Sequence, residues 1–116
     1  MDVKQVFERN SQRLSALYAG QDQLPRYAAL ADDFRAHFGC EPEMFVSAPG
    51  RTEVVGNHTD HQNGRVLAGA VNLDTVAAIA ANGKDEVRLY SAGYDAPFVV
   101  DLTDLAVRED EKNTTF

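Results

Sequence analysis

Residues 43–81 read EMFVSAPGRTEVVGNHTDHQNGRVLAGAVNLDTVAAIAA. In this stretch a polar segment, residues 50–64, separates a β-prone run from a long apolar run at residues 66–81. The long run alternates apolar side chains as a strand does, although its alanines would also permit a helix. Asn63-Gly64 is a strong turn signal at the end of the polar segment. The pattern favours strands that are joined through a polar loop.

Two short extended pieces precede the loop. Residues 43–48 are predicted to form a strand that ends at Pro49-Gly50. Residues 52–55 are predicted to form another short strand, which ends at Gly56.

The sequence after the long apolar run has the pattern of a hairpin. Residues 82–85, NGKD, predict a turn, and residues 86–91 alternate polar and apolar side chains. Residues 98–102 predict one more strand after Pro97. This context favours a strand over a helix for residues 66–81.

The N-terminal third has helical periodicity. Apolar residues recur near a helical period over residues 2–18, and Gly20 acts as a stop. The pattern repeats over residues 24–38, which Gly39 closes. Two helices followed by a mostly antiparallel β region predict an α+β fold.

The composition excludes several classes of protein. The chain has 116 residues, is 44% hydrophobic and 25% charged, and has a formal charge of −7. These values are typical of one globular domain and argue against nucleic acid as a main partner. No apolar run approaches the roughly 20 residues that span a bilayer, and the N-terminus is too polar for a signal peptide. Cys40 is the only cysteine, which excludes an intrachain disulfide and fits a reducing cytoplasm.

The polar segment has the chemistry of a sugar-recognition site. Sugar hydroxyls both donate and accept hydrogen bonds, and carboxylate, imidazole and amide groups can meet both needs. Asn57, His58 and Asp60 lie within four residues of one another, between glycines that allow sharp turns. Arg51 adds a planar fork that suits a carboxylate or a phosphate.

Two other interpretations remain open at this point. His58, Asp60 and His61 could converge on a metal ion, but no HExxH pattern accompanies them, and we predict no metal site. The segment could also be a solvated turn in which Thr59 or Asp60 caps a helix. The sequence has no GxSxG elbow, so it does not support nucleophilic catalysis by a serine. It also has no Walker A loop, so it does not support phosphate binding by a loop of that kind.

The stretch APGRTEVVGNHTDHQNGRVLAGAV resembles the N-terminal signature of galactokinases, members of the GHMP small-molecule kinase superfamily. The family pattern runs approximately A-P-G-R-x-N-x-I-G-E-H-x-D-Y-x-x-G, followed by a V-L segment. The residues in register are Ala48, Pro49, Gly50, Arg51, Gly56, His58, Asp60, Gly64, Val66 and Leu67. The resemblance covers residues 25–102 and implies the incomplete N-terminal domain of a GHMP-type kinase.

The resemblance implies roles for individual residues. Asp60 would accept hydrogen bonds from ring hydroxyls, and His58 would reach the hydroxymethyl end of the sugar. Arg51 would lie beside the transferred phosphoryl group and keep the catalytic aspartate ionised. The implied reaction transfers the γ-phosphoryl group of ATP to the anomeric hydroxyl of galactose.

Three positions depart from the family pattern. Asn57 stands where the family usually has Glu, Glu53 where it has Asn, and His61 where it has Tyr. One acid has thus moved from one side of Gly56 to the other. We assign Glu53, Asn57 and His61 to substrate binding, and the change leaves open a related hexose or a non-catalytic, sugar-binding or regulatory paralogue.

The chain lacks the motifs that the family uses for ATP and Mg²⁺. A Gly/Ser-rich phosphate loop, magnesium ligands and a catalytic aspartate do not occur in the sequence. We therefore expect an N-terminal fragment of a cytoplasmic kinase that is inactive alone. It would consist of a helical lead-in (residues 1–40), a sugar-binding β region (residues 43–102) and a truncated tail (residues 103–116). The strand edges that a missing half-domain leaves exposed would favour dimers or aggregates.

Overall fold

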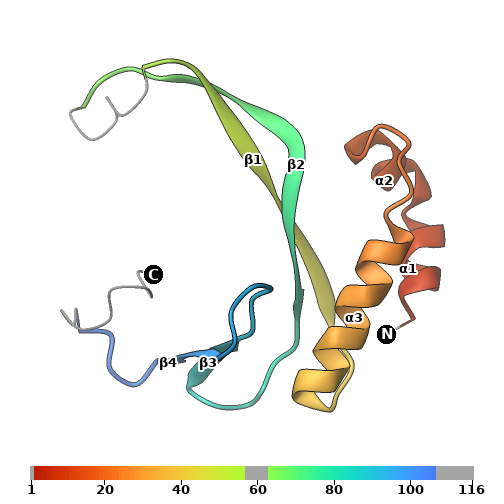
Figure 1. Ribbon diagram of the computed structural model, residues 1–116, viewed down its shortest axis with the longest axis vertical. Helices are drawn as coiled ribbons and strands as arrows, with labels where there is room; N and C mark the ends of the chain where they lie inside the picture. Colours follow the sequence, from red (N-terminus) through yellow and green to blue (C-terminus); the bar gives the residue numbers. More distant parts are fainter. Residues whose placement is uncertain (1, 57–62, 107–116) are drawn as a thin grey trace. The chain divides into compact units, whose positions relative to one another are not determined.

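The computed structural model describes residues 2–56 and 63–106 (Figure 1). The elements are α1 (Val3–Arg9), α2 (Ser11–Leu17), α3 (Leu24–Phe38), β1 (Met44–Val55), β2 (Leu67–Ile79), β3 (Glu86–Leu89) and β4 (Phe98–Asp101). The chain divides into two compact units, residues 1–80 and residues 81–116. The division falls inside the predicted 43–102 β region, so that region contributes to both units.

The α+β fold predicted from the sequence is confirmed. In the first unit, β1 and β2 form an antiparallel pair whose register runs from Met44 opposite Ile79 to Val55 opposite Leu67. In the second unit, β3 and β4 form a separate antiparallel pair. The ambiguous run at residues 66–81 is a strand, as the hairpin-like context favoured.

The prediction of two short strands before the loop is wrong in one respect. Pro49-Gly50 does not end a strand, because β1 continues through it to Val55 as one strand of 12 residues. The pairing instead shifts register at this point: Pro49 is opposite Asp74, whereas Arg51 is opposite Ala70. Residues 71–73 of β2 therefore face the single residue Gly50, and the local irregularity replaces the predicted chain break.

The predicted helix over residues 2–18 is two helices, so this prediction is also wrong in part. Asn10 lies between α1 and α2 with φ −112° and ψ 17°, outside the helical region. Its side-chain amide donates to the Val6 carbonyl oxygen at 2.8 Å. A side chain that bonds the preceding turn competes with the helical backbone, which explains why the helix ends here although the apolar periodicity continues.

The helix α3 has the bounds that the sequence predicted. Pro25 lies in its first turn, where the missing N–H costs nothing. Gly39 ends the helix with φ +69°, and its N–H donates to the Arg35 carbonyl oxygen at 2.8 Å. Within residues 2–56 and 63–106, no helix is long and apolar enough to cross a membrane.

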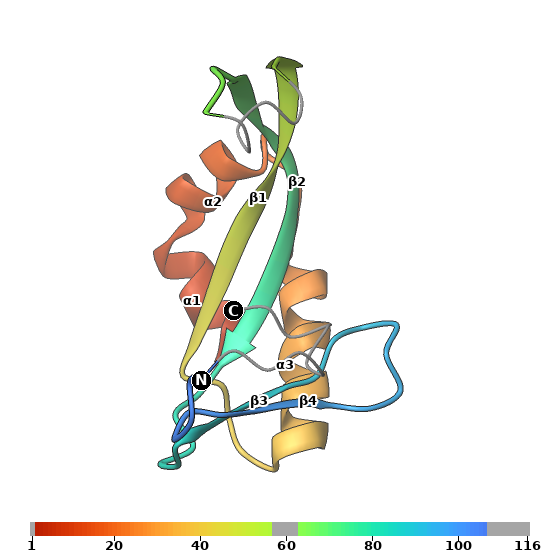
Figure 2. The ribbon, with the colours of Figure 1, turned by 90° about the vertical axis from the view of Figure 1, so that its left-hand side faces the viewer.

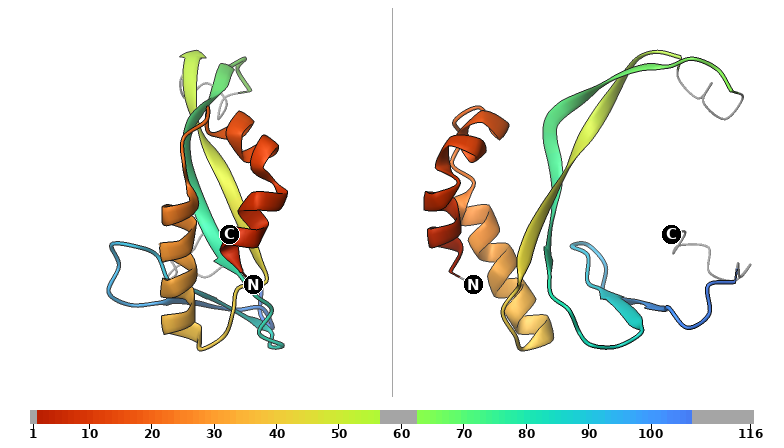
Figure 3. Two further views of the ribbon diagram at one scale, coloured as in Figure 1. Left: turned by 90° about the vertical axis from the view of Figure 1, so that its right-hand side faces the viewer. Right: turned by 180° about the vertical axis from the view of Figure 1, so that it is seen from behind.

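The three helices lie on one side of the β1–β2 pair (Figures 1 and 3). The buried centre consists of Val3, Tyr18, Tyr27 and Ala31, and Phe7, Leu14, Leu24, Phe45 and Val76 pack against it. The Tyr27 ring makes edge contacts with the Phe7 and Phe45 rings at centroid distances of 5.0 and 5.4 Å. The half of the strand pair farther from this core extends beyond the helices (Figure 2), and Val54 and Val55 there are 64% and 63% exposed.

The second unit is built around the turn that the sequence predicted at residues 82–85. The Asn82 side chain accepts from the Lys84 N–H at 2.9 Å and donates to the Glu86 carbonyl oxygen at 3.0 Å. Gly83 adopts φ +66°, which glycine tolerates without strain. The residues after this turn form the β3–β4 pair, in which Leu89 is opposite Phe98.

The register shift in the β1–β2 pair depends on Gly50. A Cβ atom at this position would lie 3.1 Å from Val71 Cγ2 and 3.2 Å from the Leu73 carbonyl oxygen. We expect Gly50→Ala to lower the free energy of unfolding by about 1–3 kcal/mol, because the β2 backbone cannot rotate away. Urea unfolding measures the change.

Gly69 provides the matched control for this substitution. It lies in the same strand pair, opposite Thr52, and an added Cβ would meet nothing within 4 Å. Gly69→Ala should therefore change stability by no more than about 0.5 kcal/mol. Equal destabilisation by the two substitutions would refute the close approach at Gly50.

Candidate functional site

Two of the predicted site residues, Arg51 and Glu53, lie on β1 beyond the register shift. Arg51 Nη2 is 3.2 Å from Glu53 Oε1, and the two side chains are 69% and 24% exposed. Residues two apart in a strand share one face of the sheet, which brings these side chains together. Because the Arg51 side chain is 69% exposed, the ion pair contributes little to stability. Most of the guanidinium surface is accessible to solvent and ligands.

The residues opposite this ion pair are small. Ala70 is opposite Arg51, and Ala68 is opposite Glu53. Directly opposed residues in an antiparallel pair point to the same face, so only methyl groups stand across from the two charged side chains. This face of the hairpin is thus open beside the cation and the carboxylate.

The polar loop is the connection between β1 and β2. Gly56 follows β1 with φ +91°, and Asn63 precedes β2 with φ +59°, both in the left-handed region. Asn63 lies in a turn, and Gly64 follows it without a regular assignment, so the predicted Asn63-Gly64 turn is seen at its first residue. The predicted site residues Asn57, His58, Asp60 and His61 lie outside the described residues, and so do the ligands of the alternative metal site. Within residues 2–56 and 63–106, no cluster of His, Cys, Asp and Glu could hold a metal ion.

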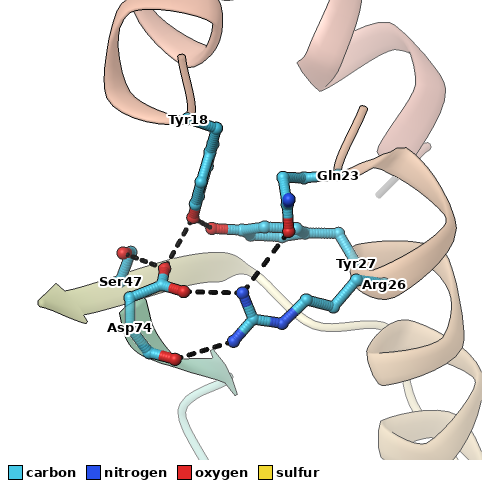
Figure 4. A network of polar contacts seen from close by, with 6 residues as sticks. All are labelled: Tyr18, Gln23, Arg26, Tyr27, Ser47 and Asp74. Carbon is cyan, nitrogen blue, oxygen red and sulfur yellow. Dashed lines mark hydrogen bonds and ion pairs between the residues drawn. The ribbon is translucent and has the colours of Figure 1, made fainter. Parts of the chain in front are cut away.

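A second group of polar residues lies where the helices meet the strand pair (Figure 4). Its centre is Asp74, whose side chain is 6% exposed. Asp74 Oδ2 accepts from the Tyr18 hydroxyl at 2.7 Å and from the Ser47 hydroxyl at 2.5 Å. Tyr27 completes the group, with its hydroxyl 2.7 Å from that of Tyr18.

Arg26 of α3 binds Asp74 through two atoms. Its Nη1 donates to Asp74 Oδ1 at 2.6 Å, and its Nη2 donates to the Asp74 carbonyl oxygen at 2.8 Å. We refer to Tyr18, Arg26, Tyr27, Ser47 and Asp74 as the Asp74 network. The network connects the end of α2, the first turn of α3, β1 and β2.

The contacts of Asp74 decide its charge. Burial raises the pKa of its carboxyl group. Hydrogen bonds from Ser47, Arg26 and Tyr18 lower the pKa by more than this, so the net value is about 2. The carboxylate is therefore ionised at neutral pH, and the hydrogen bond to Asp74 raises the pKa of Arg26 in turn. Since an ionised carboxylate only accepts, Tyr18 must donate to Asp74, and Tyr27 must donate to Tyr18. Burial and the contact with Tyr18 raise the pKa of Tyr27, which keeps it protonated.

Comparison with known proteins places the hairpin in a family. Residues 32–81 match the family model described as the galactokinase galactose-binding signature. The chain is 36% identical over 88 residues to a galactokinase of Streptomyces coelicolor, which is 75% of this chain and 23% of the relative. It is 44% identical over 63 residues to a galactokinase of Canis lupus familiaris, which is 54% of this chain and 16% of the relative. With a galactokinase of Homo sapiens the identity is 56% over 43 residues, 37% of this chain and 11% of the relative.

The chain carries a segment of the galactokinase family. The resemblance seen in the sequence is thereby confirmed. The chain spans less than a quarter of the length of these relatives, at most 23%. No solved structure matches it.

The galactokinase signature contains both strands of the hairpin. Its matched residues, 32–81, include β1, the polar loop and β2, and with them Ser47 and Asp74. Tyr18 and Arg26 lie before the matched residues, so the Asp74 network joins the signature to the preceding helices.

Sequence reasoning missed the Asp74 network. One signal was available: Asp74 is the only charged residue between Leu67 and Ile79, in a run that otherwise predicts a strand. An acid on the core side of a strand needs a cationic or hydrogen-bonding partner. Its partners Tyr18 and Arg26 are 56 and 48 residues away in the sequence, and no local pattern connects them.

The Asp74 carboxylate should make the stability of the protein depend on pH. We expect Asp74→Asn to lower the free energy of unfolding by about 2 kcal/mol at neutral pH, because three donors lose a charged acceptor, while Arg26, which is 40% exposed, keeps its contact with water. The folded-state pKa is below the unfolded-state value of about 3.9, so the stabilisation is complete above that pH and is lost as pH falls towards the folded-state pKa. The stability gap between wild type and variant should therefore stay constant from about pH 7 to about pH 4.5 and narrow as the pH falls further, to about pH 3, in urea titrations.

Asp33→Asn, at an exposed position on α3, is the control for the pH series. It removes the same charge without a buried partner, and should leave stability within about 0.5 kcal/mol of wild type. An Asp74→Asn gap that stays constant down to about pH 3 would contradict the assigned charge state.

Proposed function

We propose that this chain is the sugar-binding segment of a galactokinase-type sugar kinase. The complete enzyme would transfer the γ-phosphoryl group of ATP to the anomeric hydroxyl of galactose or a related hexose. In this reaction the anomeric oxygen loses its proton, forms the new P–O bond, and displaces ADP. The observation that carries the proposal is the match to the galactose-binding signature over residues 32–81, which includes the whole β1–β2 hairpin.

The proposed sugar contacts lie in the loop of this hairpin. Asp60 would accept hydrogen bonds from two neighbouring ring hydroxyls, since a carboxylate accepts through both oxygens. His58 would bind the hydroxymethyl end, and Asn57 and His61 would complete the loop side of the pocket. Glu53 would contribute a carboxylate from β1, at the open face opposite Ala68.

Arg51 is proposed to act on the phosphoryl group. Its guanidinium is largely exposed on the same face as Glu53, 3.2 Å from that carboxylate. A cation in this place would stabilise the charge of the phosphoryl transition state and keep a catalytic carboxylate ionised. ATP and Mg²⁺ would be held by residues outside this chain, because the sequence has no phosphate loop and no set of magnesium ligands.

Substitution of Asp60 tests the sugar site. We expect Asp60→Asn to weaken galactose binding at least about 100-fold, because an amide has no charge and only one acceptor oxygen, and its NH2 group would replace the second. Isothermal titration calorimetry with galactose measures binding, and an ADP-release assay measures phosphoryl transfer by the protein expressed from the complete reading frame. Asp33→Asn is again the matched control, and should bind as wild type does.

The outcomes separate the parts of the proposal. Unchanged galactose affinity in Asp60→Asn would remove this residue from the site. A wild-type protein that binds none of a panel of hexoses would overturn the sugar-binding role itself.

The exchanged acid suggests a second test. Relative to the family pattern, Glu53 and Asn57 interchange an acid and an amide, and Glu53 now lies beside Arg51. If the site needs one carboxylate next to the arginine, Glu53→Asn alone should lower galactose affinity about tenfold. The double substitution Glu53→Asn with Asn57→Glu should restore most of this loss. A double variant no better than the single one would show that the two positions act independently.

The same exchange favours a second candidate function, a non-catalytic sugar sensor or regulatory paralogue. Asn57 replaces the acceptor-only group of the family with an amide that can also donate, which would alter how the sugar is oriented. Hexose binding without ATP-dependent product would support this candidate. Turnover of any hexose would exclude it.

A further inference from the structure

The Asp74 carboxylate uses all of its contacts to hold separate elements together. Oδ1 binds Arg26 of α3, while Oδ2 binds Tyr18 at the end of α2 and Ser47 of β1. The backbone oxygen of Asp74 accepts a further hydrogen bond from Arg26. A neutral side chain of the same size could not accept all three donors and also neutralise the arginine. The charge is therefore needed to fix β2 against both the helices and β1 (Figure 4).

Asp74 also occupies a particular place in the strand register. It is opposite Pro49, the last paired residue of β1 before the register shift, and Arg51 is the first paired residue after it. Residues 71–73 intervene on β2 against Gly50 alone on β1. One residue of β1 thus faces three residues of β2. At such an irregularity the pairing of the following residues can slip, unless the last pair before it, Pro49 with Asp74, is held in place.

We propose that Asp74 is a positioning residue for the sugar-binding end of the hairpin. Asp74 binds Ser47 and thereby fixes β1 against β2 just before the register shift. This contact keeps Arg51 and Glu53, which follow the shift, in their register. The effect on sugar affinity rests on the proposed function. The effect on the register of the hairpin does not.

The two tyrosines of the network provide a matched pair for the test. Tyr18 and Tyr27 are each 5% exposed, and each loses one buried hydroxyl on substitution by phenylalanine. Only the Tyr18 hydroxyl touches Asp74, whereas the Tyr27 hydroxyl contacts Tyr18. Tyr18→Phe therefore removes a donor to the carboxylate, and Tyr27→Phe lowers stability without doing so. Ser47→Ala, a second direct donor, repeats the test from β1.

The experiment uses the protein expressed from the complete reading frame, with wild type, Tyr18→Phe, Ser47→Ala and Tyr27→Phe compared well below their unfolding temperatures. The first readout is amide hydrogen exchange of residues 51–55 and 67–70. We expect it to accelerate about tenfold in Tyr18→Phe and Ser47→Ala, and to stay within about twofold of wild type in Tyr27→Phe. The second readout is galactose affinity, which should fall about tenfold in the same two variants and remain unchanged in Tyr27→Phe.

The outcomes are distinguishable. If Tyr27→Phe accelerates exchange as much as Tyr18→Phe, or if neither direct donor matters, the positioning role is overturned and the network only adds stability. If wild type binds no hexose, the proposed function fails, and the exchange data still decide the positioning role.

Discussion

The first unit of this protein depends on one charged side chain, that of Asp74, which is only 6% exposed. The Asp74 carboxylate lies among a guanidinium and two hydroxyl donors, which outweigh the effect of burial and lower its pKa to about 2. An ionised acid in this position is strongly unfavourable unless hydrogen-bond donors or a cation compensate for the lost water. The partners come from α2, α3 and β1, so the carboxylate is satisfied only when the helices and both strands are assembled together.

Around this charge the packing is mostly aromatic. Tyr27 connects Phe7 of α1 with Phe45 of β1 through edge contacts, and passes a hydrogen bond to Tyr18. The apolar contacts supply burial without direction, whereas the carboxylate sets which residues meet. The core and the Asp74 network are therefore two parts of one arrangement: the first stabilises the unit, and the second specifies its register.

The distal half of the hairpin, which is one part of the galactokinase signature, extends away from this core (Figure 2). Gly50 allows β2 to approach β1 closely, and beyond it the strands present Arg51 and Glu53 opposite two alanines. This division suits the proposed sugar-binding role, because a packed base would hold the exposed end in place. Compared with the family pattern, this sequence has an acid before Gly56 instead of after it. In the structure that acid, Glu53, forms an ion pair with Arg51.

Local sequence patterns predicted much of this protein correctly. The bounds of α3, the turn at residues 82–85 and the strand character of residues 66–81 follow from neighbouring residues, because capping, turn chemistry and alternation act over a few positions. The galactokinase signature was predicted from a motif resemblance instead. The helix break at Asn10 is also local, since it involves a side-chain hydrogen bond to Val6, but apolar periodicity does not reveal it. Tertiary structure alone decided two features. The continuation of β1 through Pro49-Gly50 depends on pairing with β2. The ionised Asp74 depends on donors up to 56 residues away, and no local preference encodes a partner at that distance.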